Sequence, residues 1–464
     1  MFRRLISARN PIQFGSTIRQ VLASKPSNES IHVHGWVKSV RLQKSIAFAM
    51  IHDGTTPNGL QVVFRNPMLA KVLTNGASVR LTGILTPSLG PGQDSELLAE
   101  DVQVLGVCDP ETYPIQKQAL TTEYLRDHAH LRARTDVQGA VLRLRDTVMR
   151  RLHEFFHNND FIYVHTPIIT SNDAEGAGES FRLASVPSHP GGRGVSTENT
   201  EFFNKPSYLT VSSQLHLEAV SNALARVWTL SPCFRAERSQ TSRHLAEFWM
   251  LEAEWSFVRS IDDLCDVAEA SIKHVLRLES PDRDLLRSDI GASWAVMAKP
   301  ASEVPWARIT YTDAIHELQM SGARFEFTPR WGTALQSEHE RWLADSFAHG
   351  PIFITDYPAS IKPFYMRQND DSKTVACFDL LVPHVGELVG GSLREERVTV
   401  LEAAIKQQGL DEEAYRWYTE LRKFGGAPHG GYGMGFERLI SWIGGVENVR
   451  ECIPMPRWSG RMLL

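Results

Sequence analysis

The sequence predicts an α+β protein in which a small all-β domain precedes a larger domain with a mostly antiparallel sheet flanked by helices. Three observations predict this class. Short alternating apolar segments fill residues 31–108, helical and strand patterns mix over residues 139–464, and no internal repeat is visible. The apolar fraction of 42% is ordinary for a globular chain and allows a large core.

Length, charge and cysteine usage narrow the possibilities further. The 464 residues suggest two to four domains, and a formal charge of −5 does not by itself predict a nucleic-acid partner. The cysteines are scattered and form no CxxC pair, which argues against a zinc site or a disulfide framework and favours a reducing compartment. No apolar run approaches the roughly 20 residues that span a bilayer, so we expect no membrane insertion.

The N-terminal segment differs in composition from the rest of the chain. Residues 1–28 read "MFRRLISARNPIQFGSTIRQVLASKPSN", contain four arginines and one lysine, and precede the first acidic residue, Glu29. An Arg-rich, Ser-containing, acid-free segment is typical of a mitochondrial transit peptide and predicts the mitochondrial matrix as the location. A disordered basic arm that contacts RNA is the alternative. Either interpretation leaves this segment out of the predicted fold.

Residues 29–108 predict a small β-barrel. "IHVHGWVKSV" alternates, "SIAFAMIHDGTTPNGLQVVF" is a hairpin pattern, and "ASVRLTGILT" and "ELLAEDVQVLG" supply two more strands. Five short strands suit an OB-fold, which often binds single-stranded nucleic acid with aromatic side chains. The candidates are Trp36, Arg41, Phe48 and Gln61. Trp36 and Phe48 would equally suit the core of a barrel.

Residues 109–138 predict a charged, Pro-containing linker with a short helix, and residues 139–464 predict the larger domain. Helices are expected in "AVLRLRDTVMRRLHEFFHNN", in "SIDDLCDVAEASIKHVLRL" after a cap at Ser260 and Asp263, and in two segments closed by glycine, "LEAAIKQQG" and "DEEAYRWYTELRKFGG". Strands are expected in "FIYVHTPIIT", broken at Pro167, and in "ITDYP", "ACFDLLV" and "GELVGGS".

The glycine-rich segment "GGYGMGFERL" near the C-terminus does not predict a dinucleotide fold. No strand–helix–strand unit with a distant acidic residue follows it, and the sequence has no GxxxxGK[ST] loop. A strand whose glycines allow a flat ligand to approach the backbone fits better. Arg438, at the start of the following helix, could then reach a phosphate or form a structural salt bridge.

The segment "CFRAERSQTSRHLAEFWMLEAEWSF" predicts two strands joined by a polar loop, residues 238–244. Arg235 and Glu237 are two residues apart and are expected on one strand face. Phe248, Met250 and Glu252 are expected to share a face of the second strand. An arginine can neutralise phosphate, an aromatic ring can stack on a base, and carboxylates can hold amino groups. Together these side chains suit a nucleoside triphosphate. The loop could fold over its terminal phosphates with Arg243 and His244.

Together these segments resemble the class II aminoacyl-tRNA synthetases and, within that class, the asparaginyl-tRNA synthetases. "FIYVHTPIITSNDAEGAGESF" resembles motif 1, with Pro167 as the interface proline, "FRAERSQTSRHLAEF" motif 2, and "GGYGMGFERL" motif 3. "YMRQNDDSKTVACFDLLVPHVGELVGGSLREER" resembles the stretch before motif 3, and "HGWVKSVRLQKSIAFAMIHDG" the anticodon-binding OB-fold. The resemblance runs from about residue 31 to the C-terminus. It implies an OB-fold followed by a class II catalytic domain, and a homodimer.

The resemblance also implies the role of each site residue. For ATP it implies Arg235, Glu237, Arg243, His244, Phe248, Asp379, Glu387, Gly435 and Arg438, of which Arg235 and Arg438 would act on the reacting phosphates. Mg²⁺ would be held by Asp379 and Glu387, with Ser392 beside them. The α-ammonium group of the amino acid would be held by Glu175, Gln214 and Glu252, and the anticodon by Arg41, Phe48 and Gln61. The amino-acid carboxylate would attack the α-phosphorus of ATP without a side-chain nucleophile.

The choice between asparagine and aspartate is expected to depend on hydrogen-bond polarity, because the two are nearly isosteric. Aspartyl-tRNA synthetases would have a lysine where this chain has Leu217, and Glu218 follows it. Glu218 could accept from an amide, and Arg394 could donate to its carbonyl. Alternatively, Glu218 would be a helix-surface carboxylate and Arg394 would pair with Glu395 or Glu396.

The expected activity is therefore ATP-dependent ligation of L-asparagine to tRNA(Asn). Strict or relaxed aspartyl specificity is the first alternative. A non-catalytic tRNA-binding relative is the second, although it should have lost some of Arg235, Arg438, Asp379 and Glu387, which are all present. Two departures from the family leave contacts unassigned: Arg238 and Gln240 stand where it usually has asparagine, and the 185–200 loop is unusually long and glycine-rich.

Overall fold

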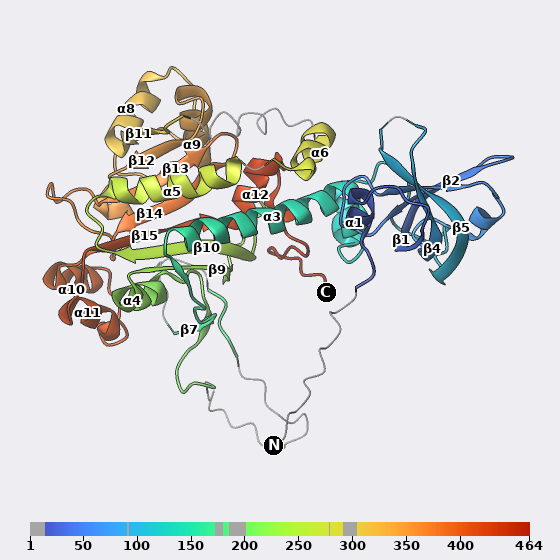
Figure 1. Cartoon of the computed structure of the whole chain (residues 1–464). Coiled ribbons are helices and arrows are strands. Elements are labelled where there is room, and N and C mark those ends of the chain that lie inside the picture. The colour runs from blue at the N-terminus through green and yellow to red at the C-terminus, as the bar shows by residue number, and fades with distance from the viewer. Residues whose placement is uncertain (1–13, 91, 172–179, 185–200, 278, 291–303) are drawn as a thin grey trace, which may run out of the picture. The chain divides into compact units, whose positions relative to one another are not determined.

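The computed structural model describes residues 14–90, 92–171, 180–184, 201–277, 279–290 and 304–464 (Figure 1). The chain forms two compact units, Met1–Arg143 and Leu144–Leu464. The unassigned 185–200 loop lies outside the described residues. Within the described residues, no helix combines the length and the apolar composition that crossing a membrane requires.

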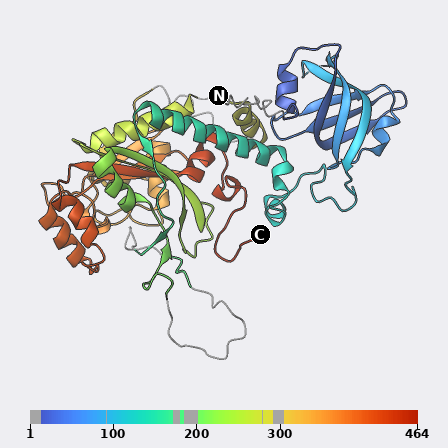
Figure 2. The ribbon, with the colours of Figure 1, turned by 60° about the horizontal axis from the view of Figure 1, so that its bottom comes forward.

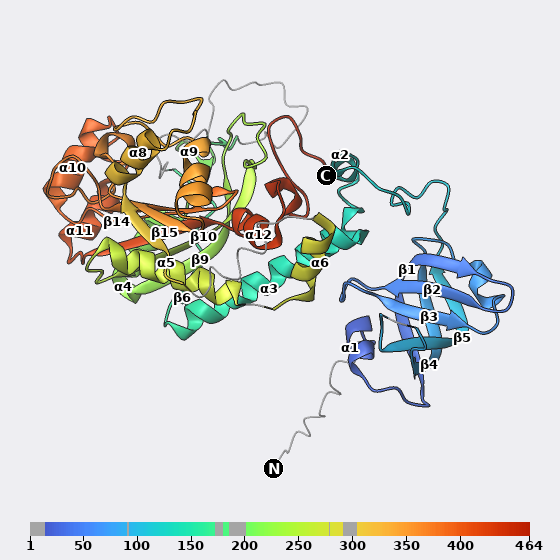
Figure 3. The same cartoon turned by 90° about the horizontal axis from the view of Figure 1, so that it is seen from above.

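The first unit is built on a closed five-stranded barrel with the strand order β1-β2-β3-β5-β4 (Figure 3). Its strands are β1 (Ser30–Leu42), β2 (Ala47–His52), β3 (Leu60–Phe64), β4 (Ser78–Pro87) and β5 (Ser95–Gly106). The pairs β1/β2, β2/β3, β1/β4 and β4/β5 are antiparallel, whereas β3 and β5 pair in parallel. The predicted OB-type barrel is confirmed, and alternate residues of its strands form the core.

A short helix, α1 (Ile18–Ala23), packs against the barrel and lies inside the segment that was expected to be a transit peptide. Ile18 and Val21 are 0% and 4% exposed and belong to the barrel core. The backbone N–H of Ile18 donates to Asp53 Oδ2 at 2.8 Å. The barrel unit therefore begins before the expected boundary at residue 29. Arg-rich composition concealed a helix of only six residues.

Deleting residues 1–28 is expected to destabilise the barrel, whereas deleting residues 1–13 is not. Burial of two aliphatic side chains contributes roughly 3–6 kcal/mol, and the shorter deletion keeps both. Hydrogen exchange of barrel peptides in the two truncated chains measures the difference. Equal protection of β1 and β4 in both chains would show that α1 adds nothing to the barrel.

The segment that was expected to be a linker, residues 109–138, belongs to the first unit and contains more structure than expected. It holds α2 (Thr122–Asp127) and a 3₁₀ turn at Arg132–Arg134. The long helix α3 (Asp136–Asn158) already begins before residue 139, the expected start of the larger domain. The helical spacing was correct, but the first turn, residues 136–139, holds only one apolar side chain, that of Val137, which is too few to show a helical period.

The second unit contains an eight-stranded sheet with the order β11-β12-β13-β14-β15-β10-β9-β6, and a two-stranded sheet, β7-β8. The strands are β6 (Ile162–Tyr163), β7 (Ile169–Thr170), β8 (Tyr208–Leu209), β9 (Arg226–Phe234), β10 (Glu247–Ser256), β11 (Ala307–Thr310), β12 (Ile352–Thr355), β13 (Cys377–Val382), β14 (Gly386–Leu393) and β15 (His429–Gly435). Only β11/β12 and β6/β9 pair in parallel in the large sheet, so the predicted mostly antiparallel sheet is confirmed.

Helices cover one face of the large sheet and border the other. The other α-helices of the described residues are α4 (Gln214–Leu224), α5 (Ile261–Leu276), α6 (Pro281–Ile290), α8 (Tyr311–Met320), α9 (Ser337–Trp342), α10 (Val398–Gln407), α11 (Arg416–Lys423) and α12 (Phe436–Gly444). Helices α3 and α5 lie side by side along one face, as Figures 1 and 2 show, with the rings of Phe155 and His274 5.9 Å apart. Alternation in β10 and β15 places Trp255 and Tyr432 toward these helices and Glu252 and Gly433 toward the opposite, open face.

Local signals that were predicted at helix ends are confirmed. The Ser260 backbone N–H donates to Asp263 Oδ2 at 3.3 Å at the start of α5. Gly409 and Gly425 follow α10 and α11 with φ of +68° and +82°, the left-handed conformation that glycine adopts most easily. One expectation was wrong: β9 ends at Phe234, so Arg235 and Glu237 lie in the loop beyond the strand.

Candidate active site

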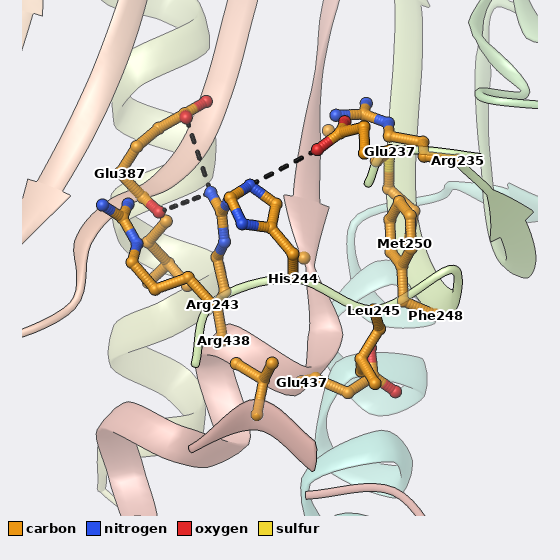
Figure 4. A pocket seen from close by; sticks show the side chains of 14 residues that line it. Arg235, Glu237, Arg243, His244, Leu245, Phe248, Met250, Glu387, Glu437 and Arg438 are labelled. Carbon is orange, nitrogen blue, oxygen red and sulfur yellow. Dashed lines mark hydrogen bonds and ion pairs between the residues drawn. The ribbon is translucent and has the colours of Figure 1, made fainter. Parts of the chain in front are cut away.

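Two adjoining cavities open on the uncovered face of the large sheet. The first, about 120 Å³, lies where the β9–β10 loop, β10, β14 and the start of α12 meet (Figure 4). It is lined by Arg235, Glu237, Arg243, His244, Leu245, Phe248, Met250, Glu387, Leu388, Gly433, Gly435, Glu437, Arg438 and Val449. Eight of the nine residues predicted for ATP are among them, all except Asp379.

Cations and one aromatic ring dominate this first cavity. The Arg235 guanidinium lies 5.5 Å from the Phe248 ring centroid. Arg438 Nη1 donates to the backbone oxygen of Glu387 at 2.9 Å, and His244 Nε2 lies 3.5 Å from Glu237 Oε2. Three arginines can neutralise a polyphosphate, and a flat base can lie on the Phe248 ring.

Arg243 reaches the first cavity from the loop, and its guanidinium group is held by two side chains of α9. Its Nη2 donates to Glu340 Oε2 at 3.1 Å and its Nη1 to Ser337 Oγ at 2.5 Å. The same Glu340 oxygen accepts from the backbone N–H of Glu387 at 3.2 Å. Burial, followed by the nearby Glu387 carboxylate, raises the pKa of Glu340 against the effect of Arg243.

The second cavity has a volume of about 340 Å³. Both acidic and basic side chains line it, so it suits a small zwitterion. It is lined by Ser212, Gln214, Leu217, Arg235, Met250, Glu252, Ala253, Glu254, Lys362, Pro363, Tyr365, Met366, Asp379, Glu387, Gly390, Gly391, Arg394, Tyr432 and Gly433. Glu252 is 3% exposed and accepts from Ser212 Oγ at 2.5 Å and from the Ser213 N–H at 2.9 Å. Carboxylates can hold an ammonium group here, while Arg235 can hold a carboxylate.

A buried ion pair forms one end of the second cavity. Arg394 donates through Nε and Nη2 to Glu254, at 3.1 and 2.8 Å, and through Nη1 to Ser392 Oγ at 2.5 Å. A Cβ on Gly431 would lie 2.1 Å from Glu254 Oε2. The absence of a side chain at Gly431 therefore leaves room for the Glu254 side chain on the neighbouring strand.

The two cavities share Arg235, Met250, Glu387 and Gly433. Ligands bound in both would therefore meet beside the Arg235 guanidinium and the Glu387 carboxylate. This junction places a carboxylate-binding and a phosphate-binding region in direct contact, which suits attack of a bound carboxylate on a bound phosphate.

Comparison with known proteins agrees with this geometry. A family model described as tRNA synthetases class II (D, K and N) matches residues 121–459, and a model of the OB-fold nucleic acid binding domain matches residues 31–105. The asparagine–tRNA ligase of Thermosynechococcus vestitus is 45% identical over 457 residues, covering 96% of this chain and 98% of the relative. The asparaginyl-tRNA synthetase of Mus musculus is 44% identical, covering 94% and 91%.

The chain belongs to the asparaginyl-tRNA synthetase family.

A solved structure of this family has the same architecture. The asparaginyl-tRNA synthetase of Pyrococcus horikoshii, in complex with asparaginyl-adenylate, superimposes with a TM-score of 0.84 at 29% identity, covering 97% of this chain and all of that one. The predicted arrangement of an OB-fold domain and a class II catalytic domain is thus confirmed.

The carboxylates expected to hold Mg²⁺ in this synthetase converge over one glycine. A Cβ placed on Gly390 would lie 3.4 Å from Glu387 Oε1 and 3.6 Å from Asp379 Oδ1. Carboxylate oxygens gathered beside a phosphate-binding region are the ligands that Mg²⁺ prefers. The side chains present therefore fit the ion.

The charges around these two carboxylates differ. Burial raises the pKa of Asp379, and Glu387 adds to this effect, whereas Lys362 opposes it. Burial also acts to raise the pKa of Glu387, but Arg438, Lys362, Arg235 and Arg243 together outweigh burial, so the pKa of Glu387 is lowered. Lys362 Nζ donates to both Asp379 oxygens, at 2.9 and 3.1 Å, and lies 4.0 Å from the Tyr357 ring centroid.

The residues predicted for amino-acid binding are only partly brought together. Gln214, Glu252 and Arg394 line the second cavity, and Glu175 lies outside the described residues. Glu218 is not among the lining residues. It is 0% exposed, so it is no helix-surface carboxylate, and the partner of Arg394 is Glu254 rather than Glu395 or Glu396.

Two charged residues of the second cavity were missed. Glu254 shares a strand face with Glu252 two residues earlier, and this spacing could have identified it. Lys362 is the one charged residue of the mostly apolar and aromatic segment "YPASIKPFYM", but a lysine there is ordinarily exposed, and its pairing with Asp379 is seen only in the structure. Neither contact partner could be inferred without the fold.

A further groove, about 670 Å³, adjoins the first cavity and shares Glu237 with it. Its walls come from the β9–β10 loop and the C-terminal segment and include Arg238, Arg457, Trp458 and Arg461. The guanidinium of Arg461 lies 5.5 Å from the Trp458 ring centroid. The first departure from the family, at Arg238 and Gln240, lies here: Arg238 lines the groove, and Gln240 Nε2 donates to Ser459 O at 3.2 Å.

The barrel residues predicted for anticodon binding lie on its outward face. Arg41 pairs across strands with Phe48, and Met50 with Gln61, while Ala49, between Phe48 and Met50, is buried. Trp36 is 38% exposed and lies 5.6 Å from the Arg134 guanidinium. Trp36 and Phe48 are therefore not part of the buried core.

Proposed function

We propose that the chain is an asparagine–tRNA ligase that forms asparaginyl-adenylate from L-asparagine and ATP and transfers the asparaginyl group to tRNA(Asn). The observation that carries this proposal is the shared wall of the two cavities at Arg235 and Glu387. An amino acid in one cavity and ATP in the other would meet there.

The side chains supply orientation and charge rather than a nucleophile. Arg235 would hold the carboxylate against the α-phosphate, and Arg243, His244 and Arg438 would hold the outer phosphates. Asp379 and Glu387 would hold Mg²⁺, which neutralises charge on the phosphates when it is bound. The amino-acid carboxylate then attacks the α-phosphorus, pyrophosphate leaves, and the rate comes from positioning and electrostatic stabilisation.

Asparagine fits the buried end of the second cavity better than aspartate. Arg394 can donate to the side-chain carbonyl, and Glu254 can accept from the amide. An aspartate carboxylate would instead face Glu254, and Leu217 offers no compensating cation. Sites built on buried hydrogen-bond polarity can reject an analogue by about 10⁴-fold.

ATP–pyrophosphate exchange with each amino acid tests the activity directly. We expect exchange with asparagine and little or none with aspartate. Stronger exchange with aspartate would establish the aspartyl alternative, and no exchange with either would support a non-catalytic relative.

Binding of tRNA is proposed at two places. The outward barrel face with Arg41, Phe48 and Gln61 would bind the anticodon, because exposed aromatic and basic side chains suit unpaired bases. The groove at Trp458, beside the first cavity, would receive the unpaired 3′ end.

Replacing Trp458 by alanine is expected to lower kcat/KM for tRNA in aminoacylation about 5- to 100-fold, because stacking of one base contributes about 1–3 kcal/mol. Exchange without tRNA should change little. Trp331→Ala is the control, since Trp331 is an exposed tryptophan (46%) that lies outside the groove. Equal loss of exchange and aminoacylation in the Trp458 variant would refute this assignment.

The mitochondrial matrix is the proposed location, supported by the Arg-rich composition before Glu29. A reporter fused to residues 1–30 should enter mitochondria, and a cytosolic signal would refute import. Processing, if it occurs, should leave α1 in the mature chain, because Ile18 and Val21 belong to the barrel core.

A homodimer is proposed from the resemblance of residues 161–181 to motif 1. Ile162, Ile168 and Ile169 in this segment are 46%, 41% and 44% exposed, which suits burial by a second copy. Sedimentation of the full chain should give twice the mass of 52.2 kDa, and a monomer at micromolar concentration would contradict the proposal.

A further inference from the structure

Helix α9 lies beside the first cavity and links two parts of its wall that are far apart in the sequence. One part is the β9–β10 loop, which carries Arg243, and the other is the start of β14, which carries Glu387. The link is Glu340 of α9, whose side chain is 14% exposed. Glu340 itself is not among the residues that line the two cavities.

Both bonds of this link end on the same carboxylate oxygen. Glu340 Oε2 accepts from Arg243 Nη2 at 3.1 Å and from the backbone N–H of Glu387 at 3.2 Å. A Cβ on Gly386 would lie 2.5 Å from this oxygen and 3.1 Å from Arg243 Nη2, so only a glycine leaves room for the pair. Gly386 also has a φ of +81°, a conformation that glycine adopts most easily. The turn before β14 is therefore shaped to receive the Glu340 carboxylate.

The rest of the segment around α9 holds this carboxylate in place. Glu338 accepts from the backbone N–H groups of Glu326 and Phe327, at 2.9 and 2.7 Å. Beyond α9, Asp345 Oδ1 accepts from the backbone N–H of His384, in the turn between β13 and β14, at 3.0 Å. Because the segment is fixed before and after the helix, its side chains are presented from a rigid support.

Arg243 can be held by α9 and bind a phosphate at the same time. A guanidinium group has five N–H donors, and the bonds to Glu340 and to Ser337 Oγ use one from Nη2 and one from Nη1. The Arg243 side chain is 21% exposed and lines the first cavity. Fixing this long side chain before ATP arrives removes an entropic cost from binding.

We propose that Glu340 is a positioning residue for adenylate formation: one carboxylate oxygen fixes the Arg243 guanidinium and the Glu387 backbone, so that both are in place when the outer phosphates of ATP bind. This inference rests on the proposed function, in which Arg243 holds those phosphates. The guanidinium charge next to Glu340 offsets the repulsion that a lone carboxylate would exert on them.

The first test separates hydrogen bonding from charge in ATP–pyrophosphate exchange by the full-length chain. In Glu340→Ala we expect the KM for ATP to rise at least about 10-fold, because hydrogen bonds to charged groups are the stronger ones. Glu340→Gln keeps one oxygen that can accept both bonds, so its KM for ATP should rise less than about threefold. A KM for ATP that does not rise in Glu340→Ala, or that rises equally in Glu340→Gln, would overturn the proposal.

The second test asks whether Glu340 acts through Arg243. In chains that already carry Arg243→Gln, the further change Glu340→Ala should alter the KM for ATP by less than about threefold, because no guanidinium is left to position. An equal effect of Glu340→Ala in both backgrounds would show that the carboxylate acts without Arg243 and would overturn the proposal.

Transfer of the asparaginyl group to tRNA supplies a readout that a general defect of the site would move. Pyrophosphate leaves before this step, so the step needs neither Arg243 nor Glu340. In a single turnover from preformed adenylate, the rate of transfer by Glu340→Ala should stay within about twofold of that of the unmodified chain. Comparable slowing of transfer and exchange would mean that Glu340 is only structural.

Glu338→Ala is the matched control. Glu338 lies two residues earlier on the same helix and is bound by two backbone N–H groups, but it lines neither cavity. Its loss should leave the KM for ATP at the value of the unmodified chain. A similar rise in this control would show that the effect comes from loosening α9 and would overturn the proposal. Absence of asparagine exchange in the unmodified chain would instead refute the proposed function.

Discussion

Replacing Arg235 by glutamine is expected to slow ATP–pyrophosphate exchange about 10²- to 10³-fold, the usual cost of losing one group that stabilises developing charge. Arg235 lines both cavities and lies over the Phe248 ring, so its guanidinium can contact both the attacking carboxylate and the α-phosphate. The loss should appear mainly in kcat, since the interaction strengthens as the phosphorus is attacked.

The control for Arg235 is Arg308→Gln. Arg308 forms an ion pair with Asp262 at 2.7 Å and lines neither cavity, so exchange should be unchanged. Arg235→Lys keeps the charge but not the planar two-pronged donor and should recover only part of the rate. If Arg235→Gln raised only the KM for ATP, the residue would bind substrate without stabilising the transition state.

Replacing Glu387 by glutamine is expected to raise the Mg²⁺ concentration for half-maximal exchange by at least about 10-fold, because even outer partners of metal ligands contribute that much. Glu387 faces Asp379 over Gly390, and it also accepts from Arg438 Nη1 at 3.4 Å. Its loss removes a negative charge next to the phosphates, while Arg438 keeps its bond to the Glu387 backbone oxygen at 2.9 Å.

A Mg²⁺ titration of exchange at saturating ATP measures this effect. Glu412→Gln serves as the control, because it removes one acidic charge from an exposed residue that lines neither cavity. An unchanged Mg²⁺ midpoint in Glu387→Gln would show that the ion is held elsewhere.

The sequence predicted the nucleotide cavity well because most of its residues come from two continuous segments, 235–250 and 433–438. Spacing along β10 and the β9–β10 loop was enough to place Phe248 with Arg243 and His244, and the glycine strand before α12 placed Arg438. The strand assignment of Arg235 and Glu237 failed only at the boundary, where the backbone leaves the sheet but the side chains still reach the cavity.

The end of the second cavity could not be predicted in this way. Gln214 and Glu218 lie four residues apart on one face of α4, so their spacing predicts that both side chains face the cavity. Tyr418 and Arg422, about 200 residues later in the chain, bind the Glu218 carboxylate. Of these two α4 side chains, only Gln214 therefore lines the cavity. Likewise, the composition of residues 1–28 predicted a single segment outside the fold. The packing of Ile18 and Val21 shows that the part of this segment around α1 belongs to the barrel.

The position of Arg235 on the wall between the two cavities has a thermodynamic consequence. Because a single guanidinium serves both ligands, their affinities depend on each other. If bound ATP changes the dissociation constant of asparagine by some factor, bound asparagine must change the dissociation constant of ATP by the same factor. Calorimetric titrations of one ligand with and without a non-reactive analogue of the other should therefore give equal factors in both orders of addition.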